Sequence, residues 1–300
     1  MAFPTGTNTA ADLAVFIPEV WGQKINDFYK SNLVFADFFT DRSDEVMGGG
    51  DTLYTPNLTE FTATAKANAT AVALNSPTET AITLVINQWY ESSFAIEDAQ
   101  AAQVMHSYSI MERYAKNAGY AIAKQLETAI GALFTSFSQN VGTEGTAIVD
   151  AVIREAIATL EGNDVPVYDG DVAFFMHPTV FWNEVQAIDK FSLAINSPVN
   201  DPTAKRPAGY LYGIPVHTST NVPASTTDGY DNMLIHEDAI HFATSPLGAG
   251  GSQGAMVGSE GIRVQSGYRM EFLSTITIAD ILYGVIENRD NAGVVIFSDL

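Results

Sequence analysis

The apolar positions between Asp98 and Phe137 recur every three or four residues, which is the period of one face of an α-helix. No proline interrupts this stretch, and Gly142 follows its expected end. At 1.5 Å per residue, a helix of about 40 residues is roughly 60 Å long, which suits an extended subunit better than a compact domain. The face comprises Val104, Tyr108, Met111, Ala115, Ala118, Ile122, Leu126, Ala129, Leu133 and Phe137.

Other structures can carry the same apolar face. A core helix of an ordinary large domain would show it, and so would one helix of a coiled coil. The coiled coil is disfavoured because the charge pairs that flank a coiled-coil seam are missing. We therefore predict one long amphipathic helix around which the rest of the chain is organised.

The segment before this helix predicts an extended excursion of the chain. A strand begins at 52–55 and is expected to end at Pro56, and a strand returns over 82–94. Residues 57–81 between them are rich in Thr, Ala and Asn, so they cannot form a core of their own. An isolated hairpin is marginal in water. We therefore expect a long two-stranded excursion with a polar tip that lies on a neighbouring subunit.

The segment after the helix alternates apolar helical and strand patterns, as a compact α/β unit would. If the last strands pair with the early ones beside the long helix, the chain is an α+β protein with two lobes. Residues 145–260 would then form an insert between the two halves of one lobe. The predicted helices are 147–160 and 178–188, the predicted strands are 171–176, 214–216, 233–235, 262–268, 271–282 and 294–297, and residues 196–209 and 248–258 read as loops.

The charge of the chain limits its partners. The 300 residues hold 14 Lys and Arg against 35 Asp and Glu, a net charge of −21. A free protein of this charge repels nucleic acid, which excludes a sequence-specific DNA binder but leaves contact with counterion-screened, packed DNA open. There are no cysteines, so no disulfide or thiolate metal site can form. No apolar run is long enough to predict a membrane span.

The segment from His236 to His241 holds the strongest candidate chemistry. Its histidines are five residues apart, whereas two histidines four apart share the face of a zinc-binding helix. The preceding 233–235 reads as a strand, and no third ligand is evident. We therefore expect a structural turn at 237–239 and no catalytic, cofactor or metal site. A metal-dependent enzyme that uses His236, Glu237 and His241 is kept as a rival hypothesis.

Several motifs, taken in their order along the chain, resemble the major capsid proteins of tailed bacteriophages, which have the HK97 fold. The matching passages cover an arm helix, an extended loop that returns into the long helix, and two parts of a compact domain. They are Ile17–Trp21 with Asn32–Phe35, Gly50–Pro56 with Ile86–Tyr90 and Phe94–Asp98, Gly209–Val216 with Asn221–Pro223, and Leu234–Ile240.

The resemblance implies a domain organisation. Residues 1–47 would be an N-terminal arm, 48–88 an extended loop, 89–140 with 262–300 a peripheral domain that holds the long spine helix, and 145–261 an axial domain. Relatives that cross-link covalently use a lysine in the extended loop. Lys66 lies there, but no motif around it matches, so the resemblance does not carry this chemistry over.

The resemblance also implies a function. The chain would be a non-enzymatic coat protein of the virion that assembles with itself, in the host cytoplasm, as pentamers and hexamers into an icosahedral head around double-stranded DNA. The expected partners are a separate scaffolding protein, a portal and a cement or decoration protein. No contact with a membrane is expected. The same fold would also suit an encapsulin, a shell that encloses enzymes. A tail or adhesion protein is a further alternative, but it would be a trimeric β-rich fibre without such a helix.

Overall fold

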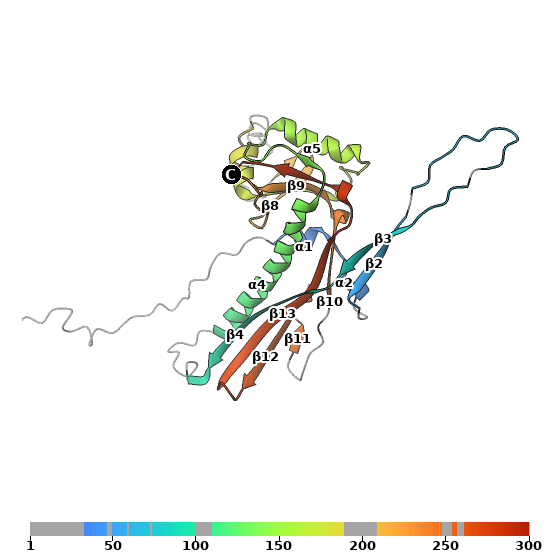
Figure 1. The fold of residues 1–300 in the computed structure, drawn as a ribbon. Helices are drawn as coiled ribbons and strands as arrows, with labels where there is room; N and C mark the ends of the chain where they lie inside the picture. The colour runs from blue at the N-terminus through green and yellow to red at the C-terminus, as the bar shows by residue number, and fades with distance from the viewer. Residues whose placement is uncertain are drawn as a thin grey trace, which may run out of the picture.

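The computed structural model describes residues 33–46, 50–58, 60–72, 74–99, 110–188, 209–245, 247, 254–256 and 261–299. It shows two sheets joined along a long helix, with a two-stranded ribbon that projects away from both (Figure 1). The arm helix expected from Ile17 onward, most of the loop at 196–209 and most of the glycine-rich stretch at 248–258 lie outside these ranges.

Helix α4 (Ile110–Ala132) continues into the 3₁₀ turn η2 (Leu133–Ser136). Its buried face includes Ile122, Leu126 and Ile130, so the predicted amphipathic helix is confirmed over this length. Asp98 and Ala99 are also helical, while residues 100–109 lie outside the described ranges. A helix long enough to extend along both sheets can hold them together.

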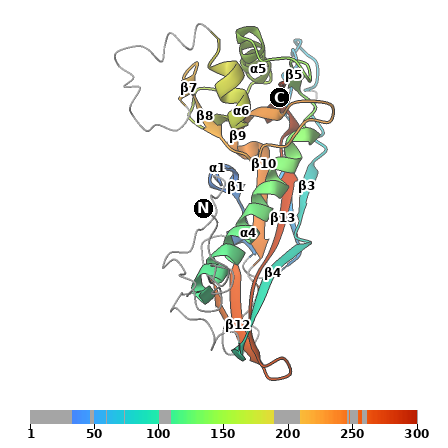
Figure 2. The same ribbon diagram turned by 90° about the vertical axis from the view of Figure 1, so that its left-hand side faces the viewer.

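The first sheet is built around the 14-residue strand β13. The face of β13 that carries Ala279, Ile281 and Tyr283 packs in one core with α4, which lies along the sheet (Figure 2). The sheet order is β1-β10-β13-β12-β11, with β4 also paired to β13. The strands are β1 (Thr40–Asp41), β4 (Gln88–Glu97), β10 (Ile240–Ser245), β11 (Gly254–Met256), β12 (Arg263–Arg269) and β13 (Ser274–Glu287).

The second sheet lies under α5 (Asp150–Gly162) and has the order β5-β14-β9-β6-β8-β7. Every residue of β6 is buried, as expected for a strand covered on both faces. Helix α6 (Pro178–Val180) and the π turn η3 (Phe181–Val185) replace the single helix predicted at 178–188. The strands are β5 (Asn140–Val141), β6 (Val172–Met176), β7 (Tyr210–Leu211), β8 (Ile214–Thr218), β9 (Asp231–His236) and β14 (Gly293–Phe297).

The chain crosses between the sheets at two neighbouring points. It leaves β9 through the 3₁₀ turn η4 (Glu237–Ala239) and enters β10, and it leaves β13 through η5 (Asp290–Ala292) and enters β14. The sequence did not predict β10, and it grouped 294–297 with the other late strands. Strand partners depend on tertiary packing more than on local pattern, which is why these two memberships were missed.

The ribbon is an antiparallel hairpin of β2 (Thr52–Asn57) and β3 (Thr80–Val85). Pro56 does not end β2 as predicted but pairs with Ala81, because a two-stranded ribbon has free edges on which a missing N–H is tolerated. The returning strand predicted over 82–94 is divided, since β3 stays in the hairpin and β4 joins the first sheet. All described residues from Leu58 to Glu79 are exposed.

Candidate assembly surfaces

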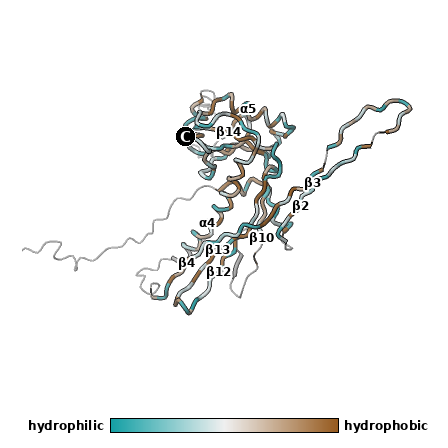
Figure 3. Tube along the Cα trace, in the orientation of Figure 1, coloured by the Kyte–Doolittle hydropathy of each residue, from teal (hydrophilic) through white to brown (hydrophobic). Residues whose placement is uncertain are grey.

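The projecting hairpin exposes more apolar surface than a polar tip would. Leu58 is 80% exposed and Leu74 is 91% exposed, and Phe61 and Val72 are exposed as well. Figure 3 shows apolar stretches, in brown, alternating with paler and hydrophilic ones along the projecting hairpin. We call the set Leu58, Phe61, Val72 and Leu74 the hairpin surface. Large apolar side chains that one subunit cannot cover mark a contact with another molecule.

The base of the hairpin is packed firmly onto the first sheet. Leu84 and Ile86 are buried against Val46 of the short helix α2 (Ser43–Val46) and against Ala243 of β10. The amide of Ile86 donates a hydrogen bond of 2.8 Å to the carbonyl oxygen of Asp51. The hairpin therefore projects from a rigid base.

Gly284 allows the hairpin to approach the sheet this closely. A Cβ at this position would lie 2.3 Å from the carbonyl oxygen of Val85. No real Cβ contact is that short, so only glycine fits between β13 and the end of β3.

A second exposed apolar surface lies at the far end of the first sheet. The turn between β12 and β13 carries Met270, Phe272 and Leu273, and Met270 is 80% exposed. The amide of Asp98 donates to the carbonyl oxygen of Leu273 at 2.9 Å, and the Tyr268 hydroxyl donates to the Asp98 carboxylate at 2.6 Å. We call Met270, Phe272 and Leu273 the sheet-end surface. It is held in place by the residues that lead toward the long helix.

A third exposed apolar surface belongs to the second sheet. Tyr210 lies on the edge strand β7, Tyr168 lies in the loop before β6, and Trp182 lies on η3. We call these residues the edge surface. The three surfaces belong to three different parts of the fold, so one subunit can contact several neighbours.

An ion pair stiffens the first sheet between the hairpin base and the sheet-end surface. Asp280 of β13 is buried and accepts hydrogen bonds from Arg263 Nε of β12 at 2.9 Å and from Trp89 Nε1 of β4 at 3.1 Å. The bond to Asp280 raises the pKa of the Arg263 guanidinium above its usual value. Three adjacent strands are thereby joined through one carboxylate.

The histidines at 236 and 241 support the crossing between the sheets. His236 Nδ1 accepts a hydrogen bond of 3.1 Å from the Asp238 amide, which closes the turn predicted at 237–239. His241 is buried, which lowers its pKa, and its Nε2 lies 3.2 Å from Asn288 Nδ2. Among the residues that the structure describes, no group of three or more His, Cys, Asp or Glu side chains is placed to hold a metal ion.

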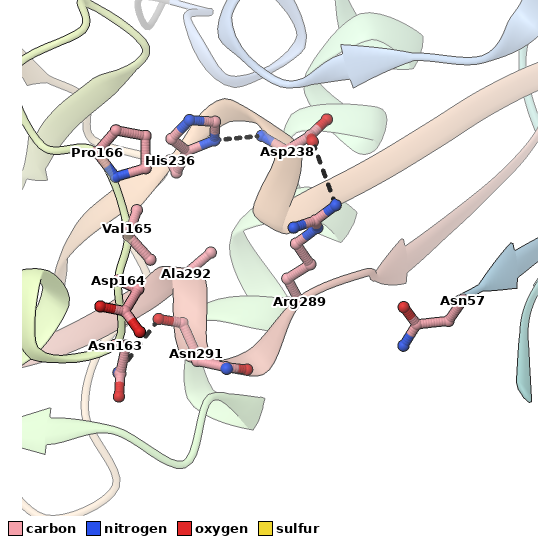
Figure 4. A pocket seen from close by; sticks show the side chains of 10 residues that line it. All are labelled: Asn57, Asn163, Asp164, Val165, Pro166, His236, Asp238, Arg289, Asn291 and Ala292. Atoms are coloured by element: carbon pink, nitrogen blue, oxygen red, sulfur yellow. Dashed lines mark hydrogen bonds and ion pairs between the residues drawn. The ribbon is translucent and has the colours of Figure 1, made fainter. Parts of the chain in front are cut away.

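A polar hollow of about 270 Å³ lies beside this crossing (Figure 4). Its groups pair with one another: Asn163 Nδ2 donates to the Asn291 carbonyl oxygen at 3.3 Å, and Arg289 lies 4.0 Å from Asp238. Asn57 of the hairpin lies apart from the others across the hollow. The lining also holds Asp164 and His236, and His236 Nδ1 already accepts a hydrogen bond from the Asp238 amide, so among these lining residues no nucleophile lies beside a free general base. The hollow is lined by Asn57, Asn163, Asp164, Val165, Pro166, His236, Asp238, Arg289, Asn291 and Ala292.

Sequence reasoning missed the buried carboxyls, among them Glu127 and Glu184. Burial raises the pKa of both, that of Glu127 to about 7. The burial of Glu127 could have been predicted from the sequence, because this residue lies one helical turn from Ala123 and from Ile130 on the apolar face of the long helix. A charged residue at such a position needs a buried partner, and the partner was not visible in the sequence.

Comparison with protein-family models gives no match, and comparison with curated protein sequences gives none. Solved structures do match. The structure titled "Mycobacterium phage Che8" aligns with a TM-score of 0.72 at 18% identity, over 94% of this chain and 97% of that chain. The capsid structure of the cyanophage P-SCSP1u aligns with a TM-score of 0.70 at 15% identity, over 98% of this chain and 96% of that chain.

A capsid of a native GTA particle also aligns, with a TM-score of 0.67 at 11% identity, over 99% of this chain and 100% of that chain. Within the described ranges, no helix has the length and apolar character to cross a membrane. The chain therefore has the fold of these phage and GTA capsid structures, and the HK97-like α+β fold class expected from its sequence is confirmed.

Proposed function

We propose that this chain is a major capsid protein, whose copies assemble as pentamers and hexamers into an icosahedral head around double-stranded DNA. The observation that carries the proposal is the alignment with the P-SCSP1u capsid structure over 98% of this chain and 96% of that one. An alignment of that extent includes the projecting hairpin as well as the two sheets. The role is structural, and we assign no catalytic step to it.

The strand pairing suggests which part of the subunit takes each role. The first sheet with α4 would be the peripheral domain, and the second sheet with α5 would be the axial domain around the five-fold and six-fold axes. We place the boundaries at the two crossings, so that 240–289 belongs to the peripheral part and 290–299 to the axial part. Residues 1–47 would be the N-terminal arm, and the extended loop at 48–88 would reach a neighbouring subunit.

The exposed apolar surfaces supply a reason to assemble. Burying apolar area contributes roughly 25 cal/mol per Å², and a stable interface needs more than about 1,000 Å². The hairpin surface, the sheet-end surface and the edge surface lie on different parts of the fold, and in a ring each subunit would set one of them against a different patch of its neighbour. Contacts between unlike patches close into rings when the rotation between subunits divides a full circle.

The charge supports non-specific enclosure of DNA over specific binding. The 14 Lys and Arg are outnumbered by 35 Asp and Glu, so the chain as a whole repels DNA and does not displace its counterions. A shell of this kind encloses packed DNA without gripping it. A separate scaffolding protein, a portal and a cement or decoration protein are the further partners that this function implies.

Negative-stain electron microscopy of the purified full-length chain, with sedimentation of the same sample, tests the proposal. We expect closed angular shells, or rings of five and six subunits. A monomer or small oligomer that persists at high salt and under crowding, with scaffold co-expressed, would contradict it. Particles that enclose an enzyme and no DNA would instead identify an encapsulin.

A further inference from the structure

Glu127 places a carboxyl group inside the apolar core beneath α4. Its side chain is 1% exposed and lies among core residues that include Leu126 and Ile130. One oxygen, Oε1, accepts hydrogen bonds from the amides of Phe35 at 2.8 Å and Ala36 at 2.9 Å. The other oxygen, Oε2, is buried and has no hydrogen bond of good geometry among the described residues, although the Val34 amide lies close enough to the carboxyl group to favour its charged form. A charge at this position would be only half satisfied.

The two amides belong to the short helix α1 (Phe35–Phe38), which follows directly from the N-terminal residues. The Phe35 ring is fully buried, and its centroid lies 5.1 Å from that of Phe134 and 5.2 Å from that of Phe175. A Cβ at Gly131 would lie 3.1 Å from this ring, so α4 has a glycine where Phe35 rests on it. Glu127 and Phe35 together join α1 to α4.

The charged groups around Glu127 do not neutralise it. Asp37 on α1 is also acidic, and its charge adds to the effect of burial. Lys124, one helical turn earlier on α4, points its side chain toward solvent. Asn221, whose carbonyl oxygen lies beside Gly131, has no charge. Burial raises the pKa of Glu127 from an ordinary 4.5 to about 7, because it outweighs the amides of Val34, Phe35 and Ala36, which favour the charged form. Both protonation states are therefore populated near neutral pH.

We infer that Glu127 is a proton-controlled latch that holds α1 against α4 when protonated and releases it when ionised. The protonated group keeps Oε1 as an acceptor for both amides and removes the buried charge. Oε2 lacks a well-placed partner in either form, so the difference between the two states is the negative charge, which is costly in a core where no described cation lies beside it. Moving α1 away lets water reach the carboxylate.

The sign of the pH dependence follows from linkage. The pKa is raised in the closed state, so the stability that it contributes is complete below pH 4.5 and is lost as the pH rises through about 7. With those two pKa values, the equilibrium constant for opening should increase about tenfold between pH 6 and pH 8.

Hydrogen exchange of the unassembled full-length chain measures this opening. Exchange of peptides that cover 33–39, corrected for the intrinsic pH dependence of amide exchange, should report the tenfold change between pH 6 and pH 8 in the wild type. Glu127→Gln should abolish it, because the amide does not titrate in this range. Glu155→Gln, a matched change at an exposed glutamate on α5, should leave it intact.

Two results would overturn the latch: a wild-type opening constant that is flat between pH 6 and pH 8, or a Glu127→Gln chain that keeps the slope. The wild-type measurement stands alone if the variant does not fold, which peptides from β6 would reveal. Because unassembled chain is used, the outcome does not depend on whether the chain forms shells.

Discussion

Single buried polar residues hold distant segments of this chain together. Asn232, which is fully buried, donates to the carbonyl oxygens of Tyr230 and Ile296 and to the Ser298 hydroxyl, and it accepts from the His177 amide at 2.9 Å. These bonds fasten the C-terminal segment to the second sheet. Asp280 does the same for three strands of the first sheet. In each case one side chain satisfies several partners, so its loss would leave several buried groups unpaired.

A substitution at Gly284 tests the close packing of the hairpin base against β13. Gly284→Ala should lower the free energy of unfolding by about 1–3 kcal/mol, because the added Cβ overpacks against the backbone of the hairpin base. Urea unfolding of the full-length chain measures the change. Gly119→Ala is the matched control: nothing lies within 4 Å of its added Cβ. There the loss of a helical glycine should raise stability by up to about 1 kcal/mol. Equal changes in both variants would refute the packing argument.

Among the elements, the hairpin depends most on neighbours. Among its described residues, the hairpin is buried against the rest of the chain at its base, through Leu84 and the adjoining Ile86, while the rest projects beyond both sheets. Two strands without a covering layer are marginal in water. Its length and its apolar side chains therefore make sense when another subunit covers it.

Removing the hairpin beyond its base should separate folding from assembly. We expect a chain in which Asn-Gly replaces 58–79 to keep the circular dichroism and melting temperature of the wild type, because none of the described residues removed is buried. It should form no closed shells by negative-stain microscopy. The triple variant Leu58→Ser, Phe61→Ser and Leu74→Ser keeps the length of the hairpin and tests its apolar contacts alone. It should weaken assembly and leave the fold of the chain intact. Normal shells from the shortened chain would show that the hairpin does not interlock subunits.

Elements with a strong local pattern could be predicted from the sequence, and those defined by distant partners could not. The apolar face of α4 and the fully apolar strand β6 can each be recognised from a short stretch of neighbouring residues. β10 could not be recognised because its place beside β13 is set by tertiary pairing. The role of Glu127 depends on an amide 92 residues away in the sequence. The exposed apolar surfaces were underestimated because scattered large residues such as Phe61 look unremarkable among threonines and alanines.

At the scale of the whole molecule, charge opposes association while apolar surface favours it. Each chain carries a net charge of −21, so subunits brought together repel one another. Added salt shortens the range of that repulsion, to about 10 Å at 0.1 M, and leaves apolar burial largely intact. Ionic strength should therefore control the concentration at which subunits assemble.

We predict that raising sodium chloride from about 20 mM to about 500 mM lowers the protein concentration at which light scattering first reports shells, since that change shortens the screening length several-fold. Potassium glutamate at the same ionic strength should have a similar effect if screening is the cause. Assembly that weakens steadily as salt rises would mean that attractive ion pairs, and not apolar contacts, hold the subunits together.

The two crossings between the sheets determine how the subunit can deform. β9 continues into β10 beside β13, which continues into β14, and the amides of Asn288 and Arg289 both donate to the carbonyl oxygen of Ala239. The sheets are thus joined by two adjacent strands as well as by the one core that runs along α4. Under the proposed function, each subunit would enter five-fold and six-fold rings as one stiff body, and the difference in curvature between the rings would fall on the contacts between subunits.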